Sequence, residues 1–397
     1  MKRVILTTFL WGGLFSLHAQ NIVVIGEVKN VEEGTTFHLE ETTGTGSTRL
    51  WSRDADEDNG KVIDGRFQLN YKCYKKDSRH FALYSESPEY STWVKLEFWA
   101  NPGDTVYVKG NGPLLGNWDI KTDAPEQKEL DVIRKACVKE LAAHQQAWLD
   151  YEAYRSYRRD TEMTETEWDS TGVILKQKDT LRTITKMALH KKQLEIMKQL
   201  PVTDFWMDYL VTILYDISPR RAEFEDIVKD IYMLHAGQIE RKPDGRAVRD
   251  WVYPYPKAAI GKPCIDGDMY DVNGNKYHFS DFRGKYVLVD FWANYCGPCI
   301  ASFPQLKKLQ EIHADRLVVI SLSIDKFPFW RTLSHHKDMT WLSLNDGGGN
   351  FGGLAGSYDV KALPTYILIA PDGTYKARLD ASAIYNGTLE KYLKDKI

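Results

Sequence analysis

The chain has 397 residues, of which 43% are hydrophobic and 27% are charged, and its formal net charge is −3. This length predicts two or three domains. Because no block of like charges interrupts the sequence, the composition gives no indication of nucleic acid or of an anionic membrane surface as a partner.

Residues 1–20 are typical of a secretory signal peptide. Lys2 and Arg3 precede an apolar run over residues 4–17, and Ala19 supplies the small residue that cleavage requires. A membrane anchor is the alternative, but polar residues and glycines interrupt the run, which is shorter than the roughly 20 apolar residues of a transmembrane helix. We therefore expect cleavage near Ala19 and a mature protein in the periplasm or outside the cell.

Residues 22–120 alternate between apolar and polar positions, as short strands do. Val23, Ile25 and Val28 open the region, and an Asp64-Gly65 turn precedes the next alternating stretch. Short strands at such intervals predict a small β-sandwich or barrel of antiparallel strands. The region contains no motif that carries chemistry.

Residues 121–250 change to helical spacing and predict an α-helical module of three to five helices. One apolar stripe begins at Leu130, and another begins at Phe224 behind a Ser218 cap. Aromatic residues also recur between Trp148 and Tyr157, where a core or a domain interface explains them better than a ligand surface does. Residues 251–258 contain two prolines that cannot continue a helix, so they predict a linker.

Residues 259–397 alternate between strands and helices. The apolar run at 286–291 predicts a buried parallel strand, and residues 300–313 predict a helix. Further strands are expected at 317–322, 364–369 and 375–379. The alternation predicts an α/β sheet with helices on both faces, and such sheets gather their chemistry at the carboxyl ends of the strands.

A Cys-x-x-Cys pair, Cys296 and Cys299, follows the buried strand and opens the helix. Backbone N–H groups and the helix dipole at this place favour a thiolate at Cys296. Three-residue spacing puts both sulfurs on one face of the helix, close enough to bridge. A zinc half-site would need two further ligands, and a permanent bridge suits the intervening Gly297 and Pro298 poorly. The pair therefore predicts a dithiol–disulfide switch without a metal or a cofactor.

Asp290 is the one acid within the apolar run of this strand. The flanking residues leave little polar surface, so we expect its carboxyl to be buried and its pKa to be raised by desolvation. The alternative is an acid that faces solvent at a strand edge.

The run from 289 to 299 resembles the active-site strand and turn of thioredoxin, and residues 259–397 resemble the TlpA/ResA-like branch of that superfamily, which also includes the AhpC/TSA proteins. Five motifs carry the second resemblance in the expected order: Ile260-Gly261-Lys262-Pro263, Asp271-Val272-Asn273-Gly274, Ser280-Asp281-Phe282-Arg283-Gly284-Lys285, Leu363-Pro364-Thr365 and Ile369-Ala370-Pro371-Asp372-Gly373. The resemblance implies a thioredoxin-like fold and a thiol–disulfide oxidoreductase that acts on protein thiols in the cell envelope. Residues 22–120 resemble, more weakly, a β-rich module of unknown role.

The resemblance also implies roles for the reacting residues. Cys296 attacks a substrate disulfide to form a mixed disulfide, and Cys299 then resolves it. Asp290 lies beneath Cys299 and takes its proton, so that this second thiol can attack.

A substrate-binding surface is implied around the pair. Pro364, in the cis form, lies against the dithiol, and the backbone of Leu363 is free to pair with an extended peptide. The side chains expected to frame this surface, besides Pro364 and Leu363, are Trp292, Tyr295, Gly297 and Pro298. For Trp292, packing in the core is an equally good explanation.

The Gly-Pro pair between the cysteines is that of thioredoxin, which predicts a reductant and, in an oxidising compartment, a membrane partner that supplies electrons. Four positions depart from the family pattern: Tyr295 replaces a usual Trp, Ile300 a basic residue, Ser302 a Glu and Ser321 a Lys. These departures leave the reaction in place but give no support for an assignment to cytochrome c maturation.

Two other functions compete with this interpretation. A thiol peroxidase would need a Pro-x-x-x-Thr-x-x-Cys setting, which is absent from the sequence. An envelope binding protein would hold its glycan or partner on residues 22–250, with the dithiol as an accessory. The odd remainder of cysteines, Cys73, Cys137 and Cys264, favours small buried residues over further bridges.

Overall fold

The computed structural model describes residues 20–42, 60–73, 79–87, 89–327, 330–331, 339–349, 352–379 and 382. The chain divides into two compact units, one drawn mainly from residues before 186 and the other mainly from residues 186–397. Residues 1–19 of the expected signal peptide, including the cleavage position at Ala19, lie outside the described residues.

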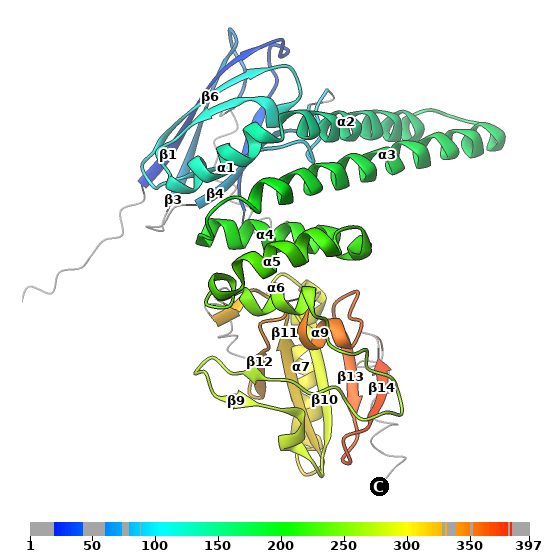
Figure 1. Cartoon of the computed structure of the whole chain (residues 1–397). Helices are drawn as coiled ribbons and strands as arrows, with labels where there is room; N and C mark the ends of the chain where they lie inside the picture. The colour runs from blue at the N-terminus through cyan, green and yellow to red at the C-terminus, as the bar shows by residue number, and fades with distance from the viewer. Residues whose placement is uncertain are drawn as a thin grey trace, which may run out of the picture. The chain divides into compact units, whose positions relative to one another are not determined.

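The first unit contains a β-sandwich, whose sheets have the strand orders β3-β1-β6-β7 and β2-β4-β5 (Figure 1). Its strands are β1 (Gln20–Lys29), β2 (Phe37–Thr42), β3 (Arg66–Cys73), β4 (Arg79–Ser85), β5 (Leu96–Ala100), β6 (Thr105–Asn111) and β7 (Asp119–Lys121). Val24 and Val106 from one sheet and Phe81 and Phe98 from the other belong to a single buried core. The alternation in the sequence therefore marks the inner faces of two packed sheets.

One strand pair of this unit differs from expectation. β1 and β6 pair in parallel, whereas the other described pairs are antiparallel as predicted. A parallel pair needs a long connection, and the segment between β1 and β6 supplies it because it contains β2 to β5. The sequence pattern shows each strand but not this distant partner.

Helices continue the first unit, and Trp148 packs one of them against the sandwich. They are η1 (Leu115–Asn117), α1 (Pro125–Ala136), α2 (Val138–Asp160) and α3 (Glu165–Met197), which extends into the second unit. Trp148 on α2 stacks on Trp93, with ring centroids 5.4 Å apart. Gln145 on α2 donates to the carbonyl of Lys95 at 3.1 Å and accepts from the N–H of Gly116 at 2.8 Å. Packing, as expected, explains Trp148.

The helices of the second unit are α4 (Asp204–Ile217), η2 (Ser218–Glu223), α5 (Glu225–Ile239) and α6 (Gly245–Val252). The expected helix start at Ser218 opens only the short 3-10 helix η2, and α5 begins after Phe224. The Ser218 hydroxyl donates back to the carbonyl of Leu214 at 2.6 Å, so it does not cap the next turn. It also accepts from the Trp251 indole at 3.0 Å, which ties α6 to the end of α4.

These helices and the sheet domain belong to the same unit. In Figure 1, α6 lies next to α9 of the sheet domain. Arg246 on α6 donates to the carbonyl of Asp268 at 2.9 Å, and Asp208 on α4 forms an ion pair with Lys326. The expected linker at 251–258 therefore begins inside α6, and residues 186–250 pack with the sheet domain.

The sheet domain has a seven-stranded sheet of the order β14-β13-β10-β11-β12-β8-β9. Its strands are β8 (Met269–Tyr270), β9 (Lys276–Tyr277), β10 (Tyr286–Trp292), β11 (Leu317–Ser323), β12 (Leu342–Asn345), β13 (Thr365–Ile369) and β14 (Tyr375–Leu379), and its helices include η3 (Phe279–Phe282), α7 (Gly297–Ile312) and α9 (Gly353–Ser357). β10 pairs in parallel with β11 and antiparallel with β13. It is buried at every position, because separate cores cover its two faces.

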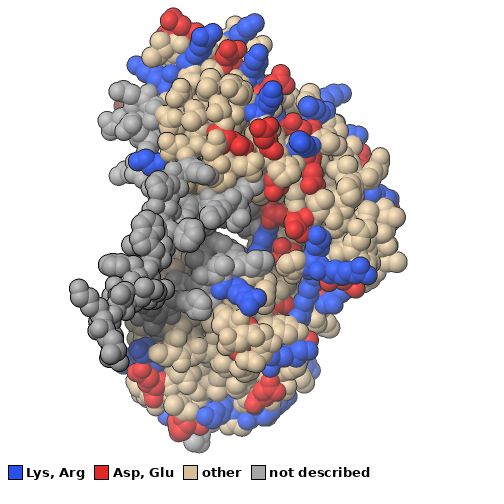
Figure 2. Space-filling view, turned by 90° about the vertical axis from the view of Figure 1, so that its left-hand side faces the viewer, with Lys and Arg blue, Asp and Glu red and all other residues tan. Residues whose placement is uncertain are grey.

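In the described part of the chain, no helix is both long enough and apolar enough to cross a bilayer. On the face drawn in Figure 2, acidic and basic side chains are interspersed, without a large field of one sign. This distribution matches the absence of like-charge blocks in the sequence.

The packing of α7 on the sheet can be tested by replacing two aliphatic side chains of similar size on this helix with alanine. Leu306 is fully buried, whereas Ile312 is 56% exposed. We expect Leu306→Ala to lower the free energy of unfolding by about 2–5 kcal/mol, because it removes buried methyl groups and leaves a cavity. Ile312→Ala should change it by less than about 0.5 kcal/mol. Denaturant unfolding measures both, and equal effects would contradict this packing.

Candidate active site

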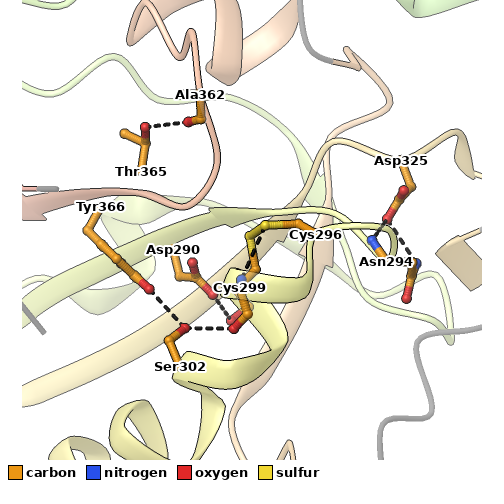
Figure 3. The surroundings of a disulfide bond; sticks show 10 residues. Asp290, Asn294, Cys296, Cys299, Ser302, Asp325, Ala362, Thr365 and Tyr366 are labelled. Atoms are coloured by element: carbon orange, nitrogen blue, oxygen red, sulfur yellow. Dashed lines mark hydrogen bonds between the residues drawn. A yellow bond between two sulfur atoms is a disulfide. The ribbon is translucent and has the colours of Figure 1, made fainter. Parts of the chain in front are cut away.

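The two cysteines lie where β10 ends and α7 begins. Cys296 is the N-cap of α7, and its sulfur accepts a hydrogen bond from the backbone N–H of Cys299 at 3.2 Å. The pair forms a disulfide with a Cα–Cα distance of 5.3 Å (Figure 3). Cys296 is 7% exposed and Cys299 is fully buried, so the first sulfur is the more accessible of the two, as predicted.

The local sequence explains this junction. The buried strand ends after Trp292, and the N–H of Cys296 closes a turn on the carbonyl of Ala293 at 3.0 Å. Gly297 and Pro298 form the exposed first turn of α7, where proline is tolerated because its missing N–H would have no partner within the helix. The pair of thiols is therefore presented at the carboxyl end of the central strand.

Asp290 lies inside the protein, as predicted. Its carboxyl is fully buried, and burial raises its pKa from 3.8 to about 7, although a hydrogen bond from Ser321 acts in the opposite direction. The Ser321 hydroxyl donates to Oδ2 at 2.9 Å, and Oδ1 has no hydrogen-bond partner among the described residues. Figure 3 shows Asp290 beside Cys299. The site therefore holds an acid that can change its protonation near neutral pH.

A second polar chain reaches the buried cysteine from the strand next to Asp290, since Tyr366 on β13 is the register partner of Asp290 on β10. Tyr366 on β13 donates to the Ser302 hydroxyl at 2.9 Å, and Ser302 donates to the carbonyl of Cys299 at 2.7 Å. Both side chains are buried. Sequence reasoning noted Ser302 only as a departure from the family pattern and missed Tyr366. A tyrosine inside a buried strand was the available signal, because its hydroxyl needs a partner there.

Asp325 holds the loop that precedes the nucleophile. Its Oδ2 accepts from the backbone N–H of Asn294 at 2.9 Å, from the Asn294 side chain at 2.8 Å and from Ser323 at 2.8 Å. Asp325 is 5% exposed. Sequence reasoning missed this carboxylate, because Asp325 lies in the segment that follows β11 and only the fold brings it to the redox loop.

The expected substrate surface is only partly exposed. Tyr295 is 52% exposed, and Leu363 and Pro364, joined by a cis peptide bond as predicted, are half-buried. Trp292 is a correction to the expected substrate surface: it is fully buried and meets Phe303 edge to face at 5.2 Å, which is the core-packing alternative for this indole. Trp292 is the last residue of the buried strand β10, which explains why its indole points inward.

The other candidate ligands do not gather into a metal centre in the described residues, where no group of three or more His, Cys, Asp or Glu side chains could hold a metal ion. Cys73 and Cys137 are buried and Cys264 is half-buried, consistent with their interpretation as packing residues. The chemistry that these residues support is therefore that of the Cys296–Cys299 pair itself.

The raised pKa of Asp290 predicts a pH-dependent stability. The folded state holds this proton up to about pH 7, whereas the unfolded chain releases it near 3.8. The stability that this group contributes is therefore fully present below about pH 3.8, and it is lost progressively as the pH rises from there to about 7. At pH 8, Asp290→Asn should be more stable than the wild type by up to about 4 kcal/mol, and at pH 5 by about 1.7 kcal/mol.

Denaturant unfolding at both pH values measures this difference. Asp315→Asn, which alters an exposed acid of the same domain, is the control and should leave the pH dependence as it is. A constant difference between Asp290→Asn and wild type from pH 5 to 8 would mean that Asp290 is ionised throughout.

Comparisons with known proteins agree with this geometry. Residues 258–379 match the Redoxin family. The thioredoxin-like protein YneN of Bacillus subtilis (strain 168) is 30% identical over 135 residues, which cover 33% of this chain and 74% of YneN. The thiol-disulfide oxidoreductase ResA of Bacillus thuringiensis subsp. konkukian (strain 97-27) is 29% identical over 140 residues, which cover 35% of this chain and 79% of ResA.

Among solved structures, the thioredoxin domain of a thiol-disulfide oxidoreductase from Bacteroides vulgatus is 28% identical and covers 35% of this chain and 100% of its own, with a TM-score of 0.32. The family match, the two relatives and the cysteine pair at the strand–helix junction all concern the same region. The chain therefore belongs to the Redoxin family, and this region is a thioredoxin-like domain of the ResA/TlpA-like thiol–disulfide oxidoreductases.

Proposed function

We propose that this protein is an exported thiol–disulfide oxidoreductase that reduces protein disulfides in the cell envelope by exchange at Cys296 and Cys299. One observation carries the proposal. The more accessible sulfur caps a helix, and the buried sulfur lies beside an acid whose pKa is about 7. This arrangement divides the two halves of a disulfide exchange between two thiols.

The first half begins with the reduced pair. The Cys296 thiolate attacks one sulfur of the substrate disulfide, which breaks as the Cys296–substrate bond forms. The other substrate sulfur leaves as a thiolate and takes a proton from water. N–H groups at the start of α7 stabilise the attacking thiolate.

The second half releases the substrate. Cys299 loses its proton to the Asp290 carboxylate and attacks the Cys296 sulfur. The mixed disulfide breaks, the second substrate sulfur leaves as a thiolate, and the Cys296–Cys299 disulfide forms. Two electrons pass from the pair to the substrate. Since the carboxylate is the proton acceptor, this step should become faster as the pH rises through 7.

The substrate is an extended polypeptide. Tyr295, Gly297 and Pro298 are exposed next to Cys296, and the half-buried Leu363 offers backbone for pairing with the peptide. Backbone pairing with a peptide suits a general protein substrate, because it does not depend on the peptide's side chains.

The direction of exchange is reduction of the substrate. Thioredoxin, which has the same Gly-Pro pair, has a potential near −270 mV, whereas the strong oxidant DsbA lies near −120 mV. The Asp290 carboxylate also disfavours a thiolate at Cys299, so the reduced pair gives up its electrons more readily. Continued reduction outside the cytoplasm requires a membrane partner that supplies electrons.

Substitution of the resolving thiol should trap the substrate. Cys299→Ser is expected to accumulate mixed disulfides through Cys296, because the second half of the exchange is blocked while the first proceeds. Non-reducing electrophoresis of the native envelope, followed by mass spectrometry, identifies the trapped proteins. The double variant Cys296→Ser/Cys299→Ser is the control. Adducts that persist in the control would assign the attack to another thiol, such as Cys264.

The reduction potential tests the direction. We expect the Cys296–Cys299 pair to lie within some tens of millivolts of about −270 mV, read as the reduced fraction in glutathione buffers. A value above about −180 mV, the region of protein disulfide isomerase, would reverse the assignment and make the protein an oxidase or isomerase.

A further inference from the structure

Helix α4 is held against the connection that follows β11. Asp208 on α4 forms an ion pair with Lys326, the residue after Asp325. Asp325 in turn bonds the backbone and side chain of Asn294 in the redox loop. A continuous path of bonded groups therefore links α4 to the segment that carries Cys296. The buried contacts of α6 with the same domain give this placement a second anchor.

This placement brings Tyr215, a tyrosine of α4, toward the redox loop. Tyr215 lies about two helical turns beyond Asp208, so the two side chains share one face of α4. Burial raises the pKa of the Tyr295 phenol to about 12, and the Tyr215 phenol and the Asp325 carboxylate act in the same direction. Tyr215 is 55% exposed and Tyr295 is 52% exposed. The two tyrosines form what we call the aromatic rim.

The rim lies beside a nucleophile that is itself nearly covered, since Cys296 is 7% exposed. A disulfide held between two polypeptide segments can reach this sulfur only if the flanking chain passes over the surface next to it. Tyrosine side chains suit such a contact, because they offer a large amphipathic area at a low entropic cost. A small disulfide without flanking chain has much less to gain from them.

We propose that Tyr215 is a specificity-determining residue of this oxidoreductase: with Tyr295 it contacts the polypeptide that flanks the substrate disulfide, so that α4 favours protein disulfides over small ones. The inference rests on the proposed function and assigns a role in it to the helical segment that precedes the redox domain. Tyr215 acts on binding and takes no part in the bond exchange.

The test uses the full chain, reduced beforehand, and two probes. Insulin supplies disulfides within a polypeptide, and hydroxyethyl disulfide supplies one without. The readout is the second-order rate constant for insulin divided by that for hydroxyethyl disulfide. Tyr215→Ala should lower this ratio about fivefold, the scale of one lost aromatic contact, and should do so through KM in steady-state assays. Tyr215→Phe should retain most of the ratio, because the ring remains.

Two further variants separate this effect from a general loss of structure. Tyr107→Ala removes a tyrosine of similar exposure, 51%, from the other unit, and its ratio should match the wild type. Asp208→Lys places two cations together and should lower the ratio as Tyr215→Ala does. The charge swap Asp208→Lys/Lys326→Asp should restore it.

The outcomes are distinct. An unchanged ratio in Tyr215→Ala, or equal losses with both probes, would overturn the role of Tyr215. Failure of the charge swap to restore a ratio lowered by Asp208→Lys would overturn the placement of α4. If the unmodified chain reduced neither probe, the proposed function would fall, and the inference with it.

Discussion

The sulfur of Cys296 accepts a hydrogen bond from the first turn of α7, and the rest of the site depends on this cap. A strand buried on both faces delivers the chain to this point, and its end fixes where the helix can begin. Because the helix starts at the sulfur, Cys299 falls one turn deeper and inside the core. Chemical asymmetry between two identical side chains thus follows from backbone geometry alone.

The same buried strand creates the electrostatics of the site. Asp290 lies among buried apolar side chains. Ser321 donates one hydrogen bond to its carboxyl, whereas a buried, ionised carboxylate would need several hydrogen bonds to offset the loss of hydration. A carboxyl that is costly to ionise becomes useful next to a thiol that must lose a proton. On the neighbouring strand, Tyr366 donates to Ser302, which in turn donates to the carbonyl of Cys299, and neither residue adds a charge. The departures from the family pattern at Ser302 and Ser321 therefore leave a site with few fixed charges.

Features that depend on local sequence could be predicted, and those that depend on distant partners could not. The apolar run, the cysteine spacing and the isolated acid located β10, α7 and the burial of Asp290. The parallel pairing of β1 with β6 and the bonds of Asp325 join residues far apart in sequence, and periodicity carries no signal for either. Ser218 was misplaced as a cap of the next helix, because its hydroxyl donates to the carbonyl of Leu214 in the preceding turn. Trp292 was misplaced because the sequence at a strand end fits a surface position and a core position equally well.

The loop from Ala293 to Cys296 has a consequence beyond its shape. Asp325 holds its middle, and a backbone bond closes its end at 3.0 Å. The entropy of ordering this segment is therefore lost when the protein folds, and little remains to be lost when a partner arrives. Encounters can then be brief and still productive, because the sulfur is already aimed. A rigid loop in this position makes the enzyme tolerant of varied partners, since the cost of organising the site is the same for all of them.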